Sequence, residues 1–371
     1  MKDLKKYQVM ALACLALLSS CGSDSEDSSP DNDYDRQTMV ANYADNLIVP
    51  AYGNFNSKAK AMATAIDAFV ASPMAENLAA ARTAYQQAYT AWQNVSVYEF
   101  GPADEQMLRS NLNTFPTSTS QIESNISSGT YNLQLTANYA AKGFPALDYL
   151  LYGAGTEAAV LEQYTSGTNA ANRKKYLQDV AHLVQQRVET VYNGWTSGDY
   201  ATTFKNAQGT AVGSAVGNLV NGLNADIDVT KRYKVGLPAG KSTSGTALPE
   251  KVEAYYSQLS LELLKQNIQA EKATFMGMTP GGTNGPGLDD YLDHVNAQYN
   301  GTLLSDAIEA QFNAVLAAAN AVQGPLSEAV TTQQPAVLKV YDELQKLIVL
   351  TKTDMPSKLG VTISYTDNDG D

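Results

Sequence analysis

Long runs rich in alanine and leucine, broken by glycine, proline and Ser-Gly, dominate the chain from Tyr34 to its C-terminus. Apolar residues recur at helical spacing, and the alternating pattern typical of a strand is almost absent. The run over 74–99 is an example. Its Tyr85, Ala88 and Trp92 belong to one broad apolar face. This pattern predicts an all-α protein.

Turn signals set the expected helix boundaries. Pro50 and Gly53 are expected to kink or break the first helix. The Gly- and Ser-rich segment 236–248 is the least regular part of the chain and is expected to be a loop. We expect helices over residues 36–71, 74–99, 121–126, 172–195, 211–229, 249–275, 288–298, 303–323 and 334–355, and a short strand or extended tail over 360–365.

The chain has 371 residues, which is long for one domain and sufficient for two. Because the loop at 236–248 interrupts the helical pattern, we expect an N-terminal helical domain over 36–235. A C-terminal helical-bundle domain is expected over 236–371. The expected architecture is therefore two packed helical bundles.

Composition and charge exclude some classes of partner. Charged residues make up 17% of the chain and hydrophobic residues 44%, which is typical of a globular protein with a sizeable core. The 38 acidic residues outnumber the 25 Lys and Arg residues, so the formal net charge is −13. Phosphate binding needs clustered Lys and Arg, so the sequence argues against nucleic acid as a partner. Cations or basic partners would be attracted instead.

The N-terminus has the pattern of a lipoprotein signal peptide. Lys2, Lys5 and Lys6 make it basic, and the apolar run over 9–18 is too short to span a bilayer. The sequence over 18–21, Leu-Ser-Ser-Cys, resembles a bacterial lipobox. Cleavage before the cysteine and acylation of its thiol would anchor the chain by lipid. An ordinary signal peptide with a chance cysteine is the alternative.

These features divide the N-terminal region into a signal peptide over 1–20 and an acidic, disordered tether over 21–35. Cys21 is the predicted lipidation site. Cys14 is the other cysteine and leaves with the signal peptide, so no disulfide is expected in the mature chain. The acidic run after Cys21 resembles a surface-export signal of Bacteroides-like bacteria. We therefore expect an outer-membrane lipoprotein of the bacterial cell envelope, either periplasmic or surface-exposed.

The segment over 143–153 reads Gly-Phe-Pro-Ala-Leu-Asp-Tyr-Leu-Leu-Tyr-Gly. It is expected to form a short apolar helix, and proline is tolerated in the first turn because the N–H groups there lack helical partners. Asp148 is the only charge in the segment. A charge on an apolar helix is costly to bury without a partner. Asp148 therefore either faces a polar cleft or caps another group.

These residues resemble the signature of imelysin-like proteins, the insulin-cleaving peptidase family of bacterial envelopes, whose motif is Gly-x-His-x-x-Glu. Gly143 matches the glycine, whereas Pro145 stands at the histidine position and Asp148 at the glutamate position. Residues 91–102, 253–261 and 360–371 also resemble the family. The resemblance implies two helical domains with a cleft between them, an envelope location, a link to iron or haem uptake, and peptidase activity.

The sequence departs from the family motif where peptidase activity would reside. Proline can neither coordinate a metal nor transfer a proton, so we expect binding and not proteolysis. We also expect Ser257 and Ser260 to lie on one helix face. Oxygen donors in a chain poor in histidine suit hard cations or polar ligands. The residues expected to form the ligand-binding cleft are Glu99, Gly143, Pro145, Asp148, Tyr149, Ser257, Ser260 and Asp290.

Other metal sites have weaker support in the sequence. A typical zinc peptidase motif is absent, and the only histidines are His182 and His294. Asp179 shares a helix face with His182, and Asp290 lies near His294, but exposed helix charge is the commoner cause of such spacing. The acidic tail over 367–371 begins like a calcium loop but lacks its spacing.

The preferred hypothesis is a lipoprotein that binds iron, haem or a related ligand in its cleft. Its expected partners are the membrane, through the lipid on Cys21, and uptake proteins of the envelope. One alternative is a divergent metallopeptidase in which Asp148 replaces the glutamate. The other is a surface lipoprotein that binds glycans or proteins through its tyrosines, such as Tyr149, Tyr255 and Tyr256.

Overall fold

The computed structural model describes residues 33–365. The chain divides into Met1–Tyr34 and a compact unit, Asp35–Asp371. The predicted signal peptide, the lipidation site Cys21, most of the predicted tether and the acidic tail lie outside the described residues. Asp35, which the sequence placed in the tether, is the N-cap of the first helix, since its side chain accepts a hydrogen bond from the Thr38 N–H.

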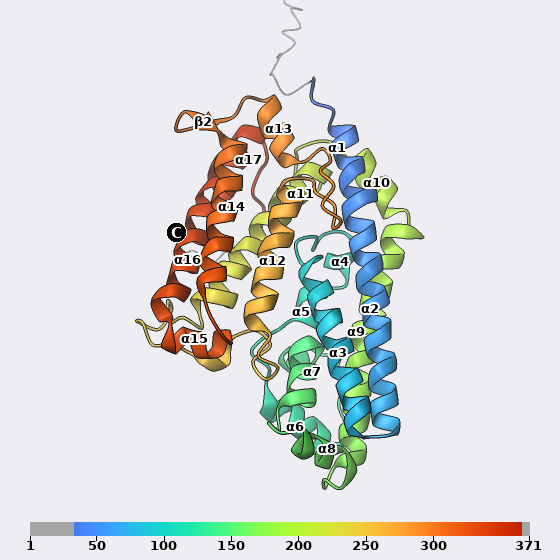
Figure 1. Ribbon diagram of the computed structural model, residues 1–371. Helices are drawn as coiled ribbons and strands as arrows, with labels where there is room; N and C mark the ends of the chain where they lie inside the picture. The colour runs from blue at the N-terminus through green and yellow to red at the C-terminus, as the bar shows by residue number, and fades with distance from the viewer. Residues whose placement is uncertain (1–32, 366–371) are drawn as a thin grey trace, which may run out of the picture. The chain divides into compact units, whose positions relative to one another are not determined.

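Nearly all the regular secondary structure of the compact unit is helical, which confirms the predicted all-α class (Figure 1). Between residues 33 and 365 the only strands, β1 and β2, have two residues each and form one antiparallel hairpin. The elements are α1 (Arg36–Asn42), η2 (Tyr43–Ile48), α2 (Val49–Ala71), α3 (Ala75–Gln93), α4 (Pro102–Glu105), α5 (Leu108–Leu112), α6 (Thr119–Ser128), η3 (Thr136–Ala141), α7 (Gly143–Tyr152), α8 (Glu157–Thr165), α9 (Ala170–Thr196), α10 (Tyr200–Asn206), α11 (Ala215–Val229), η4 (Thr230–Gly236), η5 (Pro249–Lys251), α12 (Ser260–Phe275), α13 (Leu288–His294), β1 (Gln298–Tyr299), β2 (Thr302–Leu303), α14 (Leu304–Ala321), α15 (Leu326–Thr332), α16 (Gln334–Ile348), η6 (Val349–Asp354) and α17 (Met355–Leu359).

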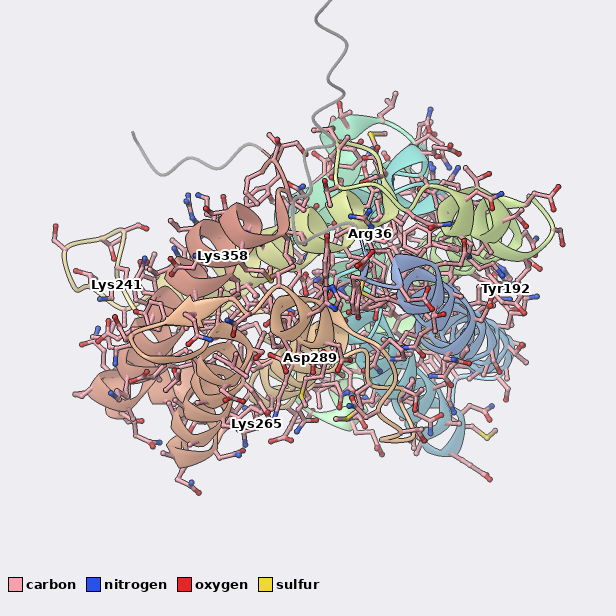
Figure 2. The ribbon with its side chains drawn as sticks, turned by 90° about the horizontal axis from the view of Figure 1, so that it is seen from above. Arg36, Tyr192, Lys241, Lys265, Asp289 and Lys358 are labelled. Carbon is pink, nitrogen blue, oxygen red and sulfur yellow. The ribbon has the colours of Figure 1, made fainter. Side chains whose placement is uncertain are left out.

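Along one side of the unit, the long helix α2 packs against two other long helices, α3 and α9 (Figure 1). Their core is aromatic: the Phe55 ring lies 6.1 Å from both Trp92 and Phe144, measured between ring centroids. Gly53 lets α2 approach α9 closely, because a Cβ there would lie 3.3 Å from the ring of Tyr192. Figure 2 shows Tyr192 at the edge of the molecule, on the side of these helices.

A second group of helices forms the rest of the unit. α14 packs on α12 and α16, and Phe275 and Phe312 join α12 to α14 in its core. α11 and η4 pack on α12 and α16, although they precede the predicted boundary at 235/236. α12 also contacts α3. The division into two domains at that boundary therefore stays a prediction.

Most predicted helices are present with small shifts of their ends. The first differs in its interior, because the chain forms the wider π-helical turns of η2 before Pro50 and is regular across Gly53. The helix predicted over 74–99 ends earlier, at Gln93. In the last described segment, residues 361–364 belong to no helix or strand.

The prediction of a continuous helix over 249–275 is wrong in its first half. Regular α-helix begins at Ser260, and only the short η5 precedes it. Ala254 and Gln258 have φ angles of 52° and 63°, which a right-handed helix does not allow. Ser257 and Ser260 therefore do not share a helix face. The irregular segment 252–259, called here the site loop, contributes to the candidate site.

Candidate functional site

Helix α7 begins at Gly143 because only glycine fits there. The φ of Gly143 is 72°, and a Cβ would lie 2.3 Å from the carbonyl oxygen of Leu112. This left-handed residue lets the chain turn from Lys142 directly into the helix. Pro145 is the third residue of α7, where its missing N–H needs no partner.

Aromatic packing fixes the orientation of α7. Phe144 is fully buried and stacks on Tyr89 of α3, with ring centroids 4.5 Å apart and planes 7° apart. The same ring also contacts Phe55 of α2. Because Phe144 is held on two sides, the next turn of α7 carries Asp148 toward Tyr85 of α3 and the site loop.

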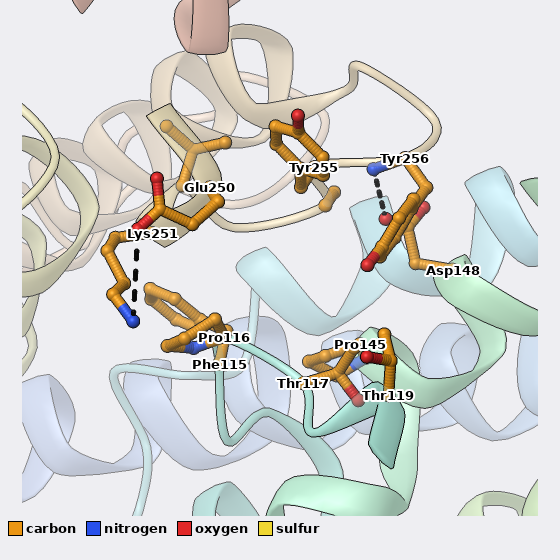
Figure 3. A pocket seen from close by; sticks show the side chains of 12 residues that line it. Phe115, Pro116, Thr117, Thr119, Pro145, Asp148, Glu250, Lys251, Tyr255 and Tyr256 are labelled. Carbon is orange, nitrogen blue, oxygen red and sulfur yellow. Dashed lines mark hydrogen bonds and ion pairs between the residues drawn. The ribbon is translucent and has the colours of Figure 1, made fainter. Parts of the chain in front are cut away.

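The Asp148 carboxylate connects α7 to the site loop (Figure 3). Its Oδ2 accepts a hydrogen bond of 2.7 Å from the Tyr256 N–H. Its Oδ1 accepts from the Ser257 N–H and from the Tyr85 hydroxyl, both at 3.1 Å. Asp148 is 1% exposed. It therefore caps the backbone of a segment more than 100 residues away, one of the two roles expected from the sequence.

Burial raises the pKa of Asp148 to about 6, although the hydrogen bonds from Ser257, Tyr256 and Tyr85 act in the opposite direction. Burial also raises the pKa of Tyr85 well above its ordinary value, and the Asp148 charge adds to this. Tyr85 is therefore a neutral hydrogen-bond donor near neutral pH. The Asp148 carboxyl group changes its charge in the weakly acidic range.

A buried ion pair holds the site loop from its other side. The Lys234 Nζ lies 3.1 Å from the Glu253 Oε2, and both side chains are at most 2% exposed. The Glu253 Oε1 accepts hydrogen bonds from Gln93 at 3.1 Å and from Asn113 at 2.7 Å. Because every partner lies on a helix or beside one, the site loop is fixed although it is irregular.

A cavity of about 220 Å³ lies between the site loop and the start of α6 and α7 (Figure 3). It is called here the junction pocket. Its walls combine aromatic rings, prolines, two threonine hydroxyls and three charged side chains. The lining residues are Phe115, Pro116, Thr117, Thr119, Pro145, Asp148, Glu250, Lys251, Val252, Ala254, Tyr255 and Tyr256.

The junction pocket brings together only some of the residues expected in the site. Pro145 and Asp148 line it. Tyr149 lies beside it, with its ring 5.2 Å from that of Tyr256 and its hydroxyl donating to Glu123. Ser257 contributes the N–H that Asp148 accepts, and Gly143 sets the start of α7.

The other expected residues have different contacts. Glu99 pairs with Arg109, the Nε–Oε2 distance being 2.5 Å, and lines a separate cavity of about 310 Å³. The Ser260 hydroxyl donates to the Glu253 carbonyl and so supports the site loop. Asp290 accepts the Gly287 N–H at the start of α13 and is exposed.

Sequence reasoning missed the segment 115–119, the pair Glu250 and Lys251, and the anchor Glu253. Tyr85 was taken for an ordinary core residue because it lies on the apolar face of α3. No local pattern distinguishes these positions, since the pocket depends on the irregular site loop and on segments distant in sequence.

Side chains that could bind a metal ion do not cluster in the described part of the chain. Between residues 33 and 365 no three or more His, Cys, Asp or Glu side chains gather in a group that could hold an ion. His182 lies 3.1 Å from Asp67 at a partly exposed site. In the same region no helix is long and apolar enough to cross a membrane.

The fold and the site define an all-α protein in which the helix that begins at Gly143 carries the Asp148 carboxylate beside an inter-helical pocket. The Imelysin (peptidase M75) family model matches residues 48–351. The chain therefore belongs to the imelysin family, which confirms the resemblance inferred from residues 143–148.

Named relatives agree with this assignment. The chain is 24% identical over 326 residues to Iron-regulated protein A of Synechococcus elongatus, covering 84% of this chain and 85% of that protein. The crystal structure of a proposed iron-regulated protein A precursor from Parabacteroides distasonis has a TM-score of 0.74, with 21% identity over 87% of this chain and 95% of the other. An imelysin-like protein from Psychrobacter arcticum has a TM-score of 0.67, with 16% identity and coverage of 89% and 97%. The two structures support the fold.

Proposed function

We propose that this chain is an iron-handling binding protein of the bacterial cell envelope, which binds a small iron-containing ligand at the junction pocket and does not cleave peptides. One observation carries the proposal. At the motif position of the histidine, Pro145 offers no ligand atom, and at the position of the glutamate both oxygens of Asp148 already accept hydrogen bonds from the chain. With no histidine beside it, this single carboxylate lacks the further protein ligands that a catalytic metal needs.

The iron-related part of the proposal is supported by relatives described as iron-regulated. A bare ferric ion needs several oxygen ligands, and the described residues offer no group of three or more acidic or histidine side chains. A small chelate brings its own ligands and needs only a polar, partly aromatic pocket. Haem is the less favoured candidate, because 220 Å³ is below the roughly 300–1,000 Å³ typical of pockets for drug-sized ligands.

Attachment to the envelope is proposed from the sequence alone. The Leu-Ser-Ser-Cys sequence over 18–21 supports cleavage before Cys21 and acylation of its thiol. A lipid at Cys21 would hold the binding unit at the outer membrane through the acidic segment that follows. Metabolic labelling with a fatty acid, absent in Cys21→Ser, tests this part.

Binding is tested by titrating the purified full chain with a ferric trihydroxamate that has a free terminal amine, with haem and with free ferric ion, followed by iron analysis of the desalted protein. We expect one equivalent of chelate in the wild type. Thr119→Trp, which fills the junction pocket, should abolish binding. Thr202→Trp on the exposed face of α10 is the matched control.

A protein that stays free of iron with all three ligands would contradict the proposal. Chelator-sensitive cleavage of peptides that is lost in Asp148→Ala would favour the metallopeptidase alternative. Binding of glycans or proteins without any iron would favour the third hypothesis.

A further inference from the structure

Asp148 is a buried carboxylate whose neighbours do not neutralise its charge. It accepts hydrogen bonds from the backbone N–H groups of Tyr256 and Ser257, from the Tyr85 phenol and from the Ser257 side chain, all of which are neutral. An ionised group in such surroundings is stabilised by a cation that enters the same space. The side chain lines the junction pocket, so a ligand in that pocket can supply the positive charge.

The charged residues at the other end of the pocket do not neutralise the Asp148 charge. Lys251 is the only cationic residue in the lining, and its Nζ lies 4.0 Å from the Glu250 Oε1. Figure 3 shows this pair at the end of the pocket away from Asp148. With both acids ionised, two negative charges and one positive charge line the cavity, so its net charge is negative.

Aromatic rings form a large part of the pocket surface. Tyr255 and Tyr256 pack edge to face, with centroids 5.1 Å apart, and Tyr255 is 38% exposed. Phe115 lines the opposite wall with Pro116. Aromatic faces beside carboxylates form the usual surroundings of an organic cation, which gains from the ring quadrupoles and from the negative charge.

We propose that the junction pocket recognises its ligand through an organic cation, an alkylammonium or guanidinium group, placed between Tyr255 and the carboxylates of Asp148 and Glu250. This inference rests on the proposed function and specifies which part of the iron chelate enters the pocket. The enclosed volume suits one such head group, with the iron-bearing remainder outside. A carboxylate oxygen can accept more than one hydrogen bond, so the Asp148 Oδ2, which accepts the Tyr256 N–H, can also accept one from the ligand.

Two matched ligand pairs test the charge directly. The first pair is N-acetylarginine amide and N-acetylcitrulline amide, which have nearly the same shape and differ in charge. The second is a ferric trihydroxamate with a free terminal amine and the same chelate with that amine acetylated. Calorimetry on the full chain should show about tenfold weaker binding of each neutral member. The two pairs distinguish a peptide-like source of the cation from an iron chelate.

Two variants locate the cation. Tyr255→Leu removes the ring and Glu250→Gln removes a charge, and each should weaken the charged member by about threefold to tenfold without affecting the neutral one. Glu262→Gln on the exposed face of α12 is the matched control, since its side chain is 74% exposed and lies outside the pocket lining. Retained folding in each variant is checked by circular dichroism.

The pH dependence of ligand binding gives an independent test of the role of Asp148. Going from about pH 7.5 to about pH 5 should weaken binding of the charged member by protonating Asp148. The phenols that face this group are Tyr85 and Tyr89 from α3, Tyr152 from α7 and Tyr256 from the site loop. All have raised pKa values, so they stay neutral. The charged groups at the other end of the pocket are Glu250 and Lys251.

The proposal is overturned if charged and neutral members bind equally, if neither charged member binds, or if Tyr255→Leu and Glu250→Gln leave the charge preference intact. A chelate that binds in the pocket, is blocked by Thr119→Trp and shows no charge preference would leave the proposed function standing while refuting the organic cation. Loss of all chelate binding would refute both.

Discussion

Lys234 and Glu253 form an ion pair of 3.1 Å in the interior, with side chains 2% and 1% exposed. They come from η4 and the site loop. The Lys234 Nζ also donates to the Gln93 Oε1, and Asn113 adds a hydrogen bond to Glu253. Two charges removed from water are tolerated because each has several partners. The pair thereby fixes the loop that forms one wall of the junction pocket.

Lys234→Met should destabilise the fold by about 3–5 kcal/mol, because it leaves the Glu253 charge buried without its partner. The double variant Lys234→Met/Glu253→Gln should lose less, since no uncompensated charge remains. Urea denaturation measures both. Lys60→Met is the control, because the Lys60–Glu189 pair is 45% and 38% exposed and should contribute less than about 1 kcal/mol. Equal losses in the single and double variants would show that the charge pairing is not the cause.

Gly143→Ala should destabilise the chain by more than about 2 kcal/mol, because it combines a left-handed φ with a clash against the Leu112 carbonyl. Gly155→Ala separates the two causes. Gly155 has a φ of 83° but no atom near the position of a Cβ, so only the conformational cost of about 1 kcal/mol is expected. Thermal or urea unfolding of both variants gives the comparison. Similar losses at both positions would mean that the Leu112 contact is not limiting.

The all-α fold could be predicted because helical spacing is a local property of the sequence. The helix predicted over 172–195 forms as α9, Ala170–Thr196, and that over 303–323 forms as α14, Leu304–Ala321. Pro50 was expected to kink the first helix. The chain instead accommodates it with the π-helical turns of η2. Local signals thus locate helices better than they locate irregularities within them.

The site was harder to predict because it depends on contacts between distant segments. The sequence over 249–259 has a helical pattern, yet tertiary contacts override it. Asp148 binds the N–H groups of Tyr256 and Ser257, and Lys234 binds the Glu253 side chain. A lone charge on an apolar helix correctly singled out Asp148. Nothing in the local sequence indicated which residues it would contact.

The stability of the protein should respond to pH through Asp148. The pKa of its carboxyl group is about 6 in the folded protein and ordinary in the unfolded chain, so the native state binds the proton more tightly. Ionisation therefore costs stability above pH 6, and the cost disappears as the pH falls through 6 toward 4. The full effect is about 3 kcal/mol.

Asp148→Asn tests this pH dependence. The quantity to compare is how the free energy of unfolding changes with pH in each protein, and not its value at a single pH. Between pH 7.5 and pH 4.5 the wild type should gain stability relative to the variant, measured by urea unfolding at each pH. Asp289, whose pKa burial raises to about 7, acts in the same direction but is present in both proteins and cancels. Parallel pH profiles in the two proteins would contradict the assignment of the raised pKa to Asp148.

Glu271 and Asp226 are two buried acids whose pKa values are shifted in opposite directions. Burial and the nearby Asp226 charge raise the pKa of Glu271 well above its ordinary value. Burial acts in the same direction on Asp226, but Arg109, at 2.6 Å, and Lys234 outweigh it, so its pKa is lowered. We therefore expect Glu271 to hold a proton more readily than Asp226.

Because an amide resembles a protonated carboxyl group, Glu271→Gln should cost less than about 1 kcal/mol, and its Oε1 can still accept from Thr230. Asp226→Asn should cost about 3–5 kcal/mol, because it removes the charge that Arg109 pairs with in the interior. Urea unfolding at pH 7 compares the two isosteric changes. A larger loss for Glu271→Gln than for Asp226→Asn would show that the proton resides on Asp226 instead.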